Sequence, residues 1–286
     1  MEKIVNMDNR IKSIILKWIV RIFLIIFTIF FMYPLFWNLM SSFKTNAEFM
    51  VNQVSFPKQL AWDNYVRAFT KANMGAYVFN SLFVVALSSV LLLLFIIPTS
   101  YALARYRFFG SRFVENLFMI CIFIQVTYIM VPLYVRMYNF NMVDSLPALS
   151  LVYAVTQFPF SIFLLAGFMR TISKSYEESA RIDGCNNWRI LISIIVPLAK
   201  SGIATVTMLA AMGFWNEYPL ALVLIRSDAK KTLPIGLAHL FQVQRRATDF
   251  GALFAALVIV LIPTVGIYLA GQRYLLKGIS AGGLKE

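Results

Sequence analysis

The stretch SYEESARIDGC, residues 175–185, is a short polar segment between two long apolar ones. Within it, Ser175 and Glu178 have the spacing of a capping box, in which each side chain satisfies a free backbone donor at a helix start. Gly184 can take the left-handed conformation that ends a helix. The stretch therefore predicts a short helix that stops in a tight bend.

A second helix is expected directly after this bend. Asn186 or Asn187 can cap it by accepting hydrogen bonds from its first free N–H groups. The apolar residues that follow recur at the i, i+3, i+4, i+7 spacing of one helical face, and they are Trp188, Leu191, Ile192 and Ile195. Two short helices around a bend favour either a plug for a socket on a soluble partner or a connector on the bilayer surface. The spacing leaves both open.

The segments around the polar stretch are long enough to cross a membrane. Hydrophobic residues make up 60% of the chain, which excludes an ordinary soluble domain. A span needs about 20 mainly apolar residues to cross roughly 30 Å of hydrocarbon. We expect one all-α polytopic domain over residues 1–286, with a polar loop at about 170–197 and six transmembrane helices, at about 19–40, 82–104, 115–135, 147–169, 199–222 and 252–272. The first apolar run is too long for a cleaved signal peptide.

The net charge of +13 is distributed as a topology signal, so no nucleic-acid partner is expected. Lys and Arg gather before the first span and after the second, fourth and sixth, which all fall on one side of the membrane. The positive-inside rule then puts both termini and the loop 170–197 in the cytoplasm. The exception is the outer segment 223–251, which carries Arg226, Lys230, Lys231, Arg245 and Arg246.

The chain lacks the patterns of a nucleotide-binding or catalytic site. No G-x-x-x-x-G-K-S/T loop is present to hold ATP, so if ATP drives this protein, another polypeptide hydrolyses it. The one histidine, His239, falls in the outer segment, where a surface residue is expected. Cys121 and Cys185 fall in different environments, so neither a disulfide nor a metal site is expected. We expect no cofactor and no enzymatic activity in this chain.

The polar stretch resembles the EAA loop of ATP-binding-cassette (ABC) importer permeases. The matching pattern is Glu178-x-Ala180-x-x-Asp183-Gly184, with Pro197 fourteen residues after the aspartate. Cys185, Leu191 and Ser201 stand where the family usually has alanine, an aromatic residue and proline. These departures are small or conservative.

Further stretches carry the resemblance along most of the chain, closest to carbohydrate importers and, among them, to the maltose-type second permease. They are Tyr33-Pro34-Leu35-Phe36-Trp37, Ser42-Phe43-Lys44, Asn80-Ser81, Tyr101-Ala102-Leu103-Ala104-Arg105 with Phe109-Gly110, Pro159-Phe160, Trp215-Asn216-Glu217-Tyr218, Thr232-Leu233-Pro234 and the tail from Gly278 to Lys285. The resemblance implies a type I ABC importer permease in a bacterial or archaeal cell membrane.

The resemblance also implies a set of partners. They are membrane lipid, a homologous second permease, two ABC ATPase subunits that bind ATP and Mg, and an extracytoplasmic solute-binding protein. In the maltose-type family the segment that corresponds to 223–251 reaches into the binding protein, and the tail docks between the ATPase subunits. From the residues alone, the segment is equally a connector and the glycine-rich tail equally a flexible end.

The resemblance assigns ATPase coupling to the EAA loop, at Glu177, Glu178, Ala180, Asp183, Gly184, Trp188 and Pro197. It implies that Glu178 and Asp183 make charged contacts with the ATPase or brace the loop. The apolar face that begins at Trp188 would pack against the ATPase socket or against the membrane domain.

Polar and aromatic side chains inside the spans are candidates for lining the translocation path, because polar groups there tend to face a bundle interior. We single out Tyr128, Tyr134, Gln157, Trp215, Asn216, Glu217 and Tyr218. Glu217 lies about 30 Å along a helix from Pro197, so it is either an interfacial carboxylate with access to water or part of the outer gate. Pro219 can kink or end the helix there. Most other aromatics are expected at membrane interfaces and in helix packing.

The sequence thus predicts the permease subunit of an ATP-driven, binding-protein-dependent importer for sugars or oligosaccharides. The spans show no ring of Lys or Arg at depth, which an anion path would carry. An ABC importer for another solute, such as an amino acid or an anion, stays open. A secondary transporter is a further alternative, although it would more often show intramembrane carboxylates or broken helices near the midplane.

Overall fold

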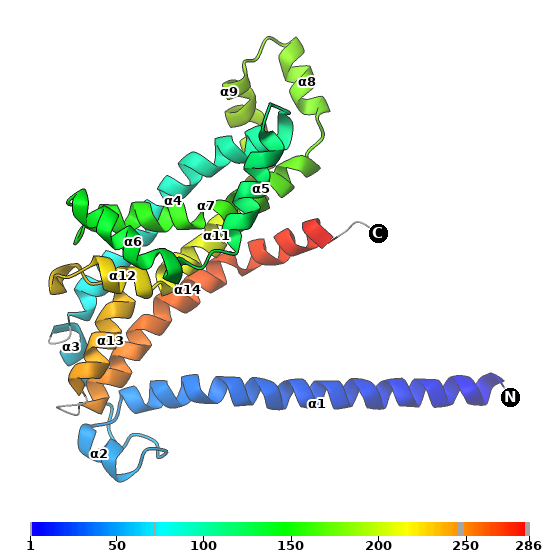
Figure 1. Ribbon diagram of the computed structural model, residues 1–286. Coiled ribbons are helices and arrows are strands. Elements are labelled where there is room, and N and C mark those ends of the chain that lie inside the picture. The colour runs from blue at the N-terminus through cyan, green and yellow to red at the C-terminus, as the bar shows by residue number, and fades with distance from the viewer. Residues whose placement is uncertain (1, 71–72, 245–248, 284–286) are drawn as a thin grey trace. The chain divides into compact units, whose positions relative to one another are not determined.

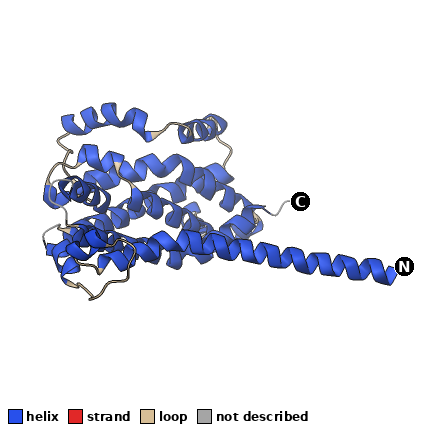
Figure 2. Ribbon diagram, turned by 90° about the horizontal axis from the view of Figure 1, so that it is seen from below, coloured by secondary structure: helices blue, strands red, loops and turns tan. Residues whose placement is uncertain are grey.

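The computed structural model describes residues 2–70, 73–244 and 249–283 (Figure 1). All regular secondary structure in these ranges is helical (Figure 2). Four of the described helices are long and apolar enough to cross a membrane, and the number rises to six if each of two bent helix pairs is one span. The four lie in α1 (Glu2–Ser42), α4 (Met74–Arg105), α7 (Leu146–Thr171) and α14 (Phe250–Gly283).

The chain forms two compact units. Unit 1 comprises Met1–Phe69 and Val243–Val258, and unit 2 comprises Thr70–Gln242 and Ile259–Glu286. Unit 1 contains α1, α2 (Asn46–Val51), most of α3 (Asp63–Thr70) and the start of α14. The predicted coupling loop and all the candidate path residues belong to unit 2.

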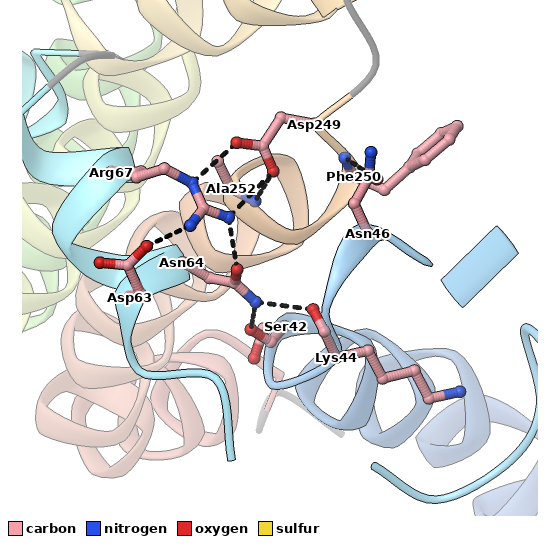
Figure 3. A network of polar contacts seen from close by, with 9 residues as sticks. All are labelled: Ser42, Lys44, Asn46, Asp63, Asn64, Arg67, Asp249, Phe250 and Ala252. Atoms are coloured by element: carbon pink, nitrogen blue, oxygen red, sulfur yellow. Dashed lines mark hydrogen bonds and ion pairs between the residues drawn. The ribbon is translucent and has the colours of Figure 1, made fainter. Parts of the chain in front are cut away.

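A polar network holds unit 1 together (Figure 3). Asn64 is buried and donates to the carbonyl oxygens of Ser42 at 2.7 Å and Lys44 at 2.8 Å. The Arg67 guanidinium donates to Asn64 at 2.7 Å and pairs with Asp249 at 2.8 Å. The network therefore ties α3 to the end of α1 and to the start of α14.

The Ser42-Phe43-Lys44 stretch has a structural role in this unit. Lys44 is fully buried, and its ammonium donates to the carbonyl oxygens of Asn52 at 3.1 Å and Gln53 at 3.0 Å. Carbonyls at the C-terminal end of a helix attract a cation, and these follow the end of α2. The hydrogen bonds offset the cost of burying the charge.

The core of unit 2 is built from α4 and α7, which pack along each other, and from α11 (Lys200–Asn216), which contacts both. Fully buried serines let the backbones approach closely, and Ser100 of α4 donates to the carbonyl of Ile162 in α7 at 3.3 Å. Next, α5 (Ser111–Ile122) packs against α7, and α6 (Val126–Asn139) packs against α12 (Pro219–Leu224).

The expected third span, 115–135, is not one straight helix. It divides into α5 and α6, which are bent by 102° at a break over residues 123–125. Gln125 in this break has an extended backbone, with φ −67° and ψ 133°. Residues 115–131 contain neither glycine nor proline, so the usual markers of a helix break are missing and hydropathy alone shows a continuous run.

The expected fifth span, 199–222, ends early. Helix α11 stops at Asn216, and α12 begins at Pro219, as the proline predicted. Segment 223–251 contains the short 3-10 helix η2 (Asp228–Lys230) and α13 (Leu233–Gln244). His239 lies exposed on α13.

Two of the stretches that carry the family resemblance, Asn80-Ser81 and Thr232-Leu233-Pro234, help to hold segment 223–251 against α4. The Asn80 side chain donates to the carbonyls of Ala229 at 2.8 Å and Lys231 at 3.0 Å. The Ser81 hydroxyl accepts the N–H of Leu233 at 2.8 Å, and Leu233 is fully buried. These contacts position the start of α13.

Candidate functional site

The first helix of the polar stretch, α8 (Ser175–Ile182), ends in the predicted bend. Gly184 has φ +81°. Its N–H donates to the carbonyl of Arg181 at 3.0 Å, and the N–H of Cys185 donates to that of Ala180 at 2.9 Å. This pair of bonds is the Schellman arrangement that closes a helix through a left-handed residue. The prediction for Gly184 is confirmed.

The predicted capping box is wrong. Ser175 is the first residue of α8, so its hydroxyl lies inside the first turn and not at the cap. Lys174 is the N-cap and its side chain makes no capping bond, while the Ser173 hydroxyl accepts the N–H of Ser175 at 3.3 Å. Glu178 is exposed, where its charge still complements the positive end of the helix dipole.

Glu177 is buried and clamps α8 to the end of α4. One carboxylate oxygen lies 2.5 Å from Nε of Arg105, and the two side chains are only 6% and 4% exposed. The other oxygen accepts the Tyr101 hydroxyl at 3.2 Å. Arg105 also donates to the carbonyl of Ile172 at the end of α7 at 2.8 Å. One buried ion pair thus joins α4, α7 and α8.

The sequence placed Glu177 in the coupling set but did not separate it from its neighbour. A helical signal was available, because Ala180 lies three residues after Glu177 and shares its face. Ala180 is buried as well, whereas Glu178 and Arg181 are exposed. A small residue such as Ala180, one turn from Glu177, is the signal that would have marked this face of α8 as the inner one.

The second helix begins at the expected cap, since the Asn186 side chain accepts the N–H of Arg189 at 2.8 Å. It continues as α9 (Asn187–Ile190), the π-helical η1 (Leu191–Ile195) and α10 (Val196–Leu198). Pro197 lies exposed in α10, and the chain turns by 77° before α11. The predicted coupling loop therefore meets α11 at a sharp angle.

The expected single apolar face is wrong. Leu191 and Ile195 are buried, whereas Trp188 is 66% exposed and Ile192 is 63% exposed. The i→i+5 turn of a π-helix changes the angular spacing of side chains, so the apolar residues divide between two faces. Leu191 and Ile195 pack against the rest of unit 2, and the Trp188–Ile192 pair is exposed.

Glu178, Asp183 and Gly184 are also exposed. Figure 1 shows α8 and α9 side by side, beyond the connection of α4 and α5. The structure thus brings most of the predicted coupling residues to one protruding part of unit 2. Glu177 and Ala180 are the exceptions, because they face inward.

The candidate path residues do not share one environment. Tyr128 is 78% exposed and Gln157 is half-buried. Tyr134 accepts a hydrogen bond from Arg226, whose guanidinium lies 5.5 Å from the centre of the ring. Trp215 is buried and donates to the Thr264 hydroxyl at 2.9 Å, which joins α11 to α14.

Glu217 occupies the break between α11 and α12. Its carboxylate accepts the N–H groups of Leu220 at 2.7 Å and Ala221 at 3.1 Å, so it caps α12 in the manner of a helix N-cap. It also accepts the hydroxyl of the buried Tyr153 in α7 at 2.5 Å. The sequence missed this role. Of its neighbours, Asn216 is exposed and Tyr218 is half-buried.

Asp144 organises the turn between α6 and α7. It has φ +58°, and its carboxylate accepts the N–H groups of Arg226 at 3.0 Å and Ser227 at 2.9 Å. Lys230 pairs with it at 3.1 Å. Burial alone would raise the pKa of Asp144, but the hydrogen bonds from Ser227, Arg226 and Lys230 hold that pKa far below its ordinary value.

The basic residues of the outer segment are therefore engaged within the chain where the structure describes them. Lys231 pairs with Asp228 at 2.5 Å, and Arg226 and Lys230 have the partners given above. Arg245 and Arg246 lie outside the described residues. The described residues contain no group of three or more His, Cys, Asp or Glu side chains that could hold a metal ion.

The family model for the binding-protein-dependent transport system inner membrane component matches residues 6–280. The chain belongs to this family. It is a multi-pass inner membrane protein and a transport permease rather than an enzyme. The resemblance to ABC importer permeases that the EAA stretch suggested is confirmed.

Two curated relatives and one solved structure agree with this assignment. The diacetylchitobiose uptake system permease protein NgcG of Streptomyces coelicolor is 33% identical over 259 residues, which is 91% of this chain and 86% of that protein. The arabinooligosaccharides transport system permease protein AraQ of Halalkalibacterium halodurans is 31% identical over 281 residues, covering 97% and 99%. A bacterial ABC transporter that imports the acidic polysaccharide alginate has a chain with TM-score 0.80 and 26% identity, covering 91% and 96%.

Proposed function

We propose that this permease imports a sugar or oligosaccharide. The names of NgcG, AraQ and the alginate transporter describe saccharide import by similar proteins. The chain would act with a homologous second permease, two ABC ATPase subunits that bind ATP and Mg, and an extracytoplasmic binding protein. ATP hydrolysis would take place on the ATPase subunits alone.

The buried clamp of Glu177 and Arg105 is the observation that carries the coupling role of α8. A helix that transmits movement needs one face fixed to the membrane domain and another face free for the ATPase. Removing one charge of the clamp would leave the other buried and unpaired, which typically costs about 3–5 kcal/mol. Glu178, Asp183 and Trp188 on the exposed side would then contact the ATPase.

Coupling through this helix follows the logic of a population shift. ATP drives the permease from one state to another only by the difference in free energy with which it favours those states. Movement of the ATPase would displace α8, and the clamp would carry the displacement into α4 and α7. Both termini and the α8–α9 pair would lie in the cytoplasm, as the distribution of Lys and Arg predicts.

Two helix breaks support a polar path. Non-helical backbone at membrane depth is tolerated where it lines a water-filled cavity or is buried in protein. The breaks at residues 123–125 and 217–218 leave such backbone near Tyr128 and Asn216 in sequence. We assign Tyr128, Tyr134, Gln157, Asn216 and Tyr218 to the path. Trp215 and Glu217 instead position the helices around it.

Stimulated ATP hydrolysis tests the substrate. The reconstituted complex with its binding protein is expected to hydrolyse ATP faster with a member of a carbohydrate panel than with amino acids or anions. Amino acids are the informative control, since a neutral path also suits a zwitterion. Stimulation by an amino acid and by no carbohydrate would overturn the substrate class and leave the family assignment standing.

A further inference from the structure

A basic cavity of about 710 Å³ lies in unit 2 where α4 ends and α5 begins. The ends of α4 and α7, the start of α5, and the α4–α5 and α7–α8 connections supply its lining. Five of the lining side chains are cationic, namely Arg105, Arg107, Arg112, Arg170 and Lys174, and Glu115 is the acidic one.

The cavity carries more positive than negative charge. Arg105 is paired with Glu177 behind it, and Arg170 is paired with Glu115 at 2.7 Å. The remaining three cations, Arg107, Arg112 and Lys174, are exposed and form no ion pair with any residue that the structure describes. Five cations against two carboxylates leave a surplus of three positive charges.

Apolar residues next to the cavity could contact the hydrocarbon part of a lipid. A narrow crevice shares Leu103, Glu115 and Arg170 with the cavity, and its other lining residues are Phe118, Ile162, Phe163 and Ala166. The connection between α4 and α5 also exposes Phe108 and Phe109, and the first turn of α5 exposes Phe113. Phenylalanines next to Lys and Arg are typical of segments that lie at the membrane–water interface.

We propose that this cavity binds the phosphate headgroup of an anionic phospholipid, with its acyl chains beside the exposed phenylalanines. Guanidinium groups match the geometry of a phosphate through paired N–H donors, and basic pockets between transmembrane helices on the cytoplasmic side bind such headgroups. The proposal is independent of the substrate. Because Arg105 lines the cavity, the bound lipid lies next to the clamp that holds α8.

Lipid retention by the purified full complex tests the proposal. Native mass spectrometry in detergent measures the affinity for added phosphatidylglycerol and for phosphatidylcholine. Each arginine near the headgroup contributes about fivefold to association. The double variant Arg107→Gln/Arg112→Gln is therefore expected to bind phosphatidylglycerol roughly 25-fold more weakly. Arg107→Lys/Arg112→Lys keeps the charge and is expected to keep most of the affinity.

The matched control is Arg189→Gln/Lys200→Gln, which removes two exposed cations that do not line the cavity. All four substitutions are at exposed sites, so the complex is expected to stay folded, and thermal melting checks this. Equal loss of phosphatidylglycerol in the cavity and control variants would overturn the proposal.

Two further outcomes would also overturn it. Inorganic phosphate that displaces phosphatidylglycerol at matched concentration would show that the site is one for free phosphate. Loss of the ATPase subunits from the Arg107→Gln/Arg112→Gln complex with unchanged lipid retention would show that the cavity faces a protein. Selective loss of phosphatidylglycerol alone supports the lipid site.

Discussion

Replacing Glu177 by alanine should detach α8 from the membrane domain. The substitution removes the carboxylate that pairs with Arg105 and accepts the Tyr101 hydroxyl. Losing one partner of a buried ion pair typically costs about 3–5 kcal/mol, because the other charge stays buried and unpaired. Arg105 would keep its hydrogen bond to the carbonyl of Ile172, so we expect the lower end of this range.

A cost of about 3 kcal/mol corresponds to a shift of roughly 100-fold toward the detached helix, at about 1.4 kcal/mol for each factor of ten. Hydrogen exchange on the assembled complex measures this shift directly. The backbone amides of α8 should lose protection by about that factor, while those of α4 and α7 keep theirs. Reconstituted complexes should then show ATP hydrolysis that is poorly coupled to uptake.

Glu178→Ala is the matched control, because it removes a carboxylate from the adjacent but exposed position. It should leave the exchange of α8 amides unchanged and reduce recovery of the ATPase subunits in a pull-down. A lost charge-assisted hydrogen bond of about 1–2 kcal/mol would lower that recovery roughly tenfold. The two neighbouring variants thus separate holding the helix from contacting the partner.

A compensating variant distinguishes coupling from general instability. Arg105→Met/Glu177→Leu replaces the ion pair by apolar side chains, which is often neutral or stabilising at buried sites. It should restore protection of α8. Wild-type protection of α8 and wild-type coupling in the Glu177→Ala complex would refute this prediction, because the ion pair would then not be what holds α8 against α4.

Three other predictions follow from the same geometry. Gly184→Leu should reduce uptake without preventing insertion into the membrane, since a branched residue at φ +81° costs roughly 1–2 kcal/mol. Gly184→Asn should largely preserve uptake, because asparagine tolerates this conformation and no atom lies within 4 Å of a new Cβ. With Cys121 replaced by alanine, Cys185 should react with a membrane-impermeant thiol reagent in inside-out vesicles, and labelling in intact cells would invert the topology. Asp144→Asn should lower the melting temperature of the complex at pH 7 through lost charge-assisted hydrogen bonds, about 1–3 kcal/mol. The pKa of Asp144 is lowered in the folded chain, so the stability that its carboxylate contributes is present above about pH 4 and is lost only at lower pH. A difference in melting temperature between wild type and variant that changed between pH 5 and 8 would contradict this assignment.

Some local chemistry was readable from the sequence because the decisive partner lay within a few residues, although the Ser175–Glu178 capping box shows that spacing alone can misplace a helix start by one residue. The bend at Gly184 needs only a residue that tolerates positive φ, and the Asn186 cap bonds to a donor three residues away. The break before Pro219 follows from the missing N–H of proline. Long apolar runs likewise predict spans without knowledge of their neighbours.

The sequence could not show features that depend on tertiary contacts. Arg105 and Glu177 lie on different helices, and nothing in the spacing of either residue identifies the other as its partner. The same holds for the hydrogen bond between Glu217 and Tyr153, which joins residues on two different segments far apart in the sequence. The π-helical turn at Leu191–Ile195 is a further case, because it reassigned Trp188 and Ile192 to the exposed side.

The paired glutamates show why composition and motif matching stop short of mechanism. Successive residues on a helix are turned by about 100°, so Glu177 and Glu178 must face different surroundings whatever their shared chemistry. One carboxylate is held by Arg105 in the interior, and the other is exposed. The arginines after α4 divide in the same way, since Arg105 is paired inside the protein while Arg107 and Arg112 line the open cavity. The basic cluster at the end of α4 therefore has two parts. Its inward member fixes α8 through Glu177, and its outward members create the surplus positive charge that an anionic headgroup would neutralise.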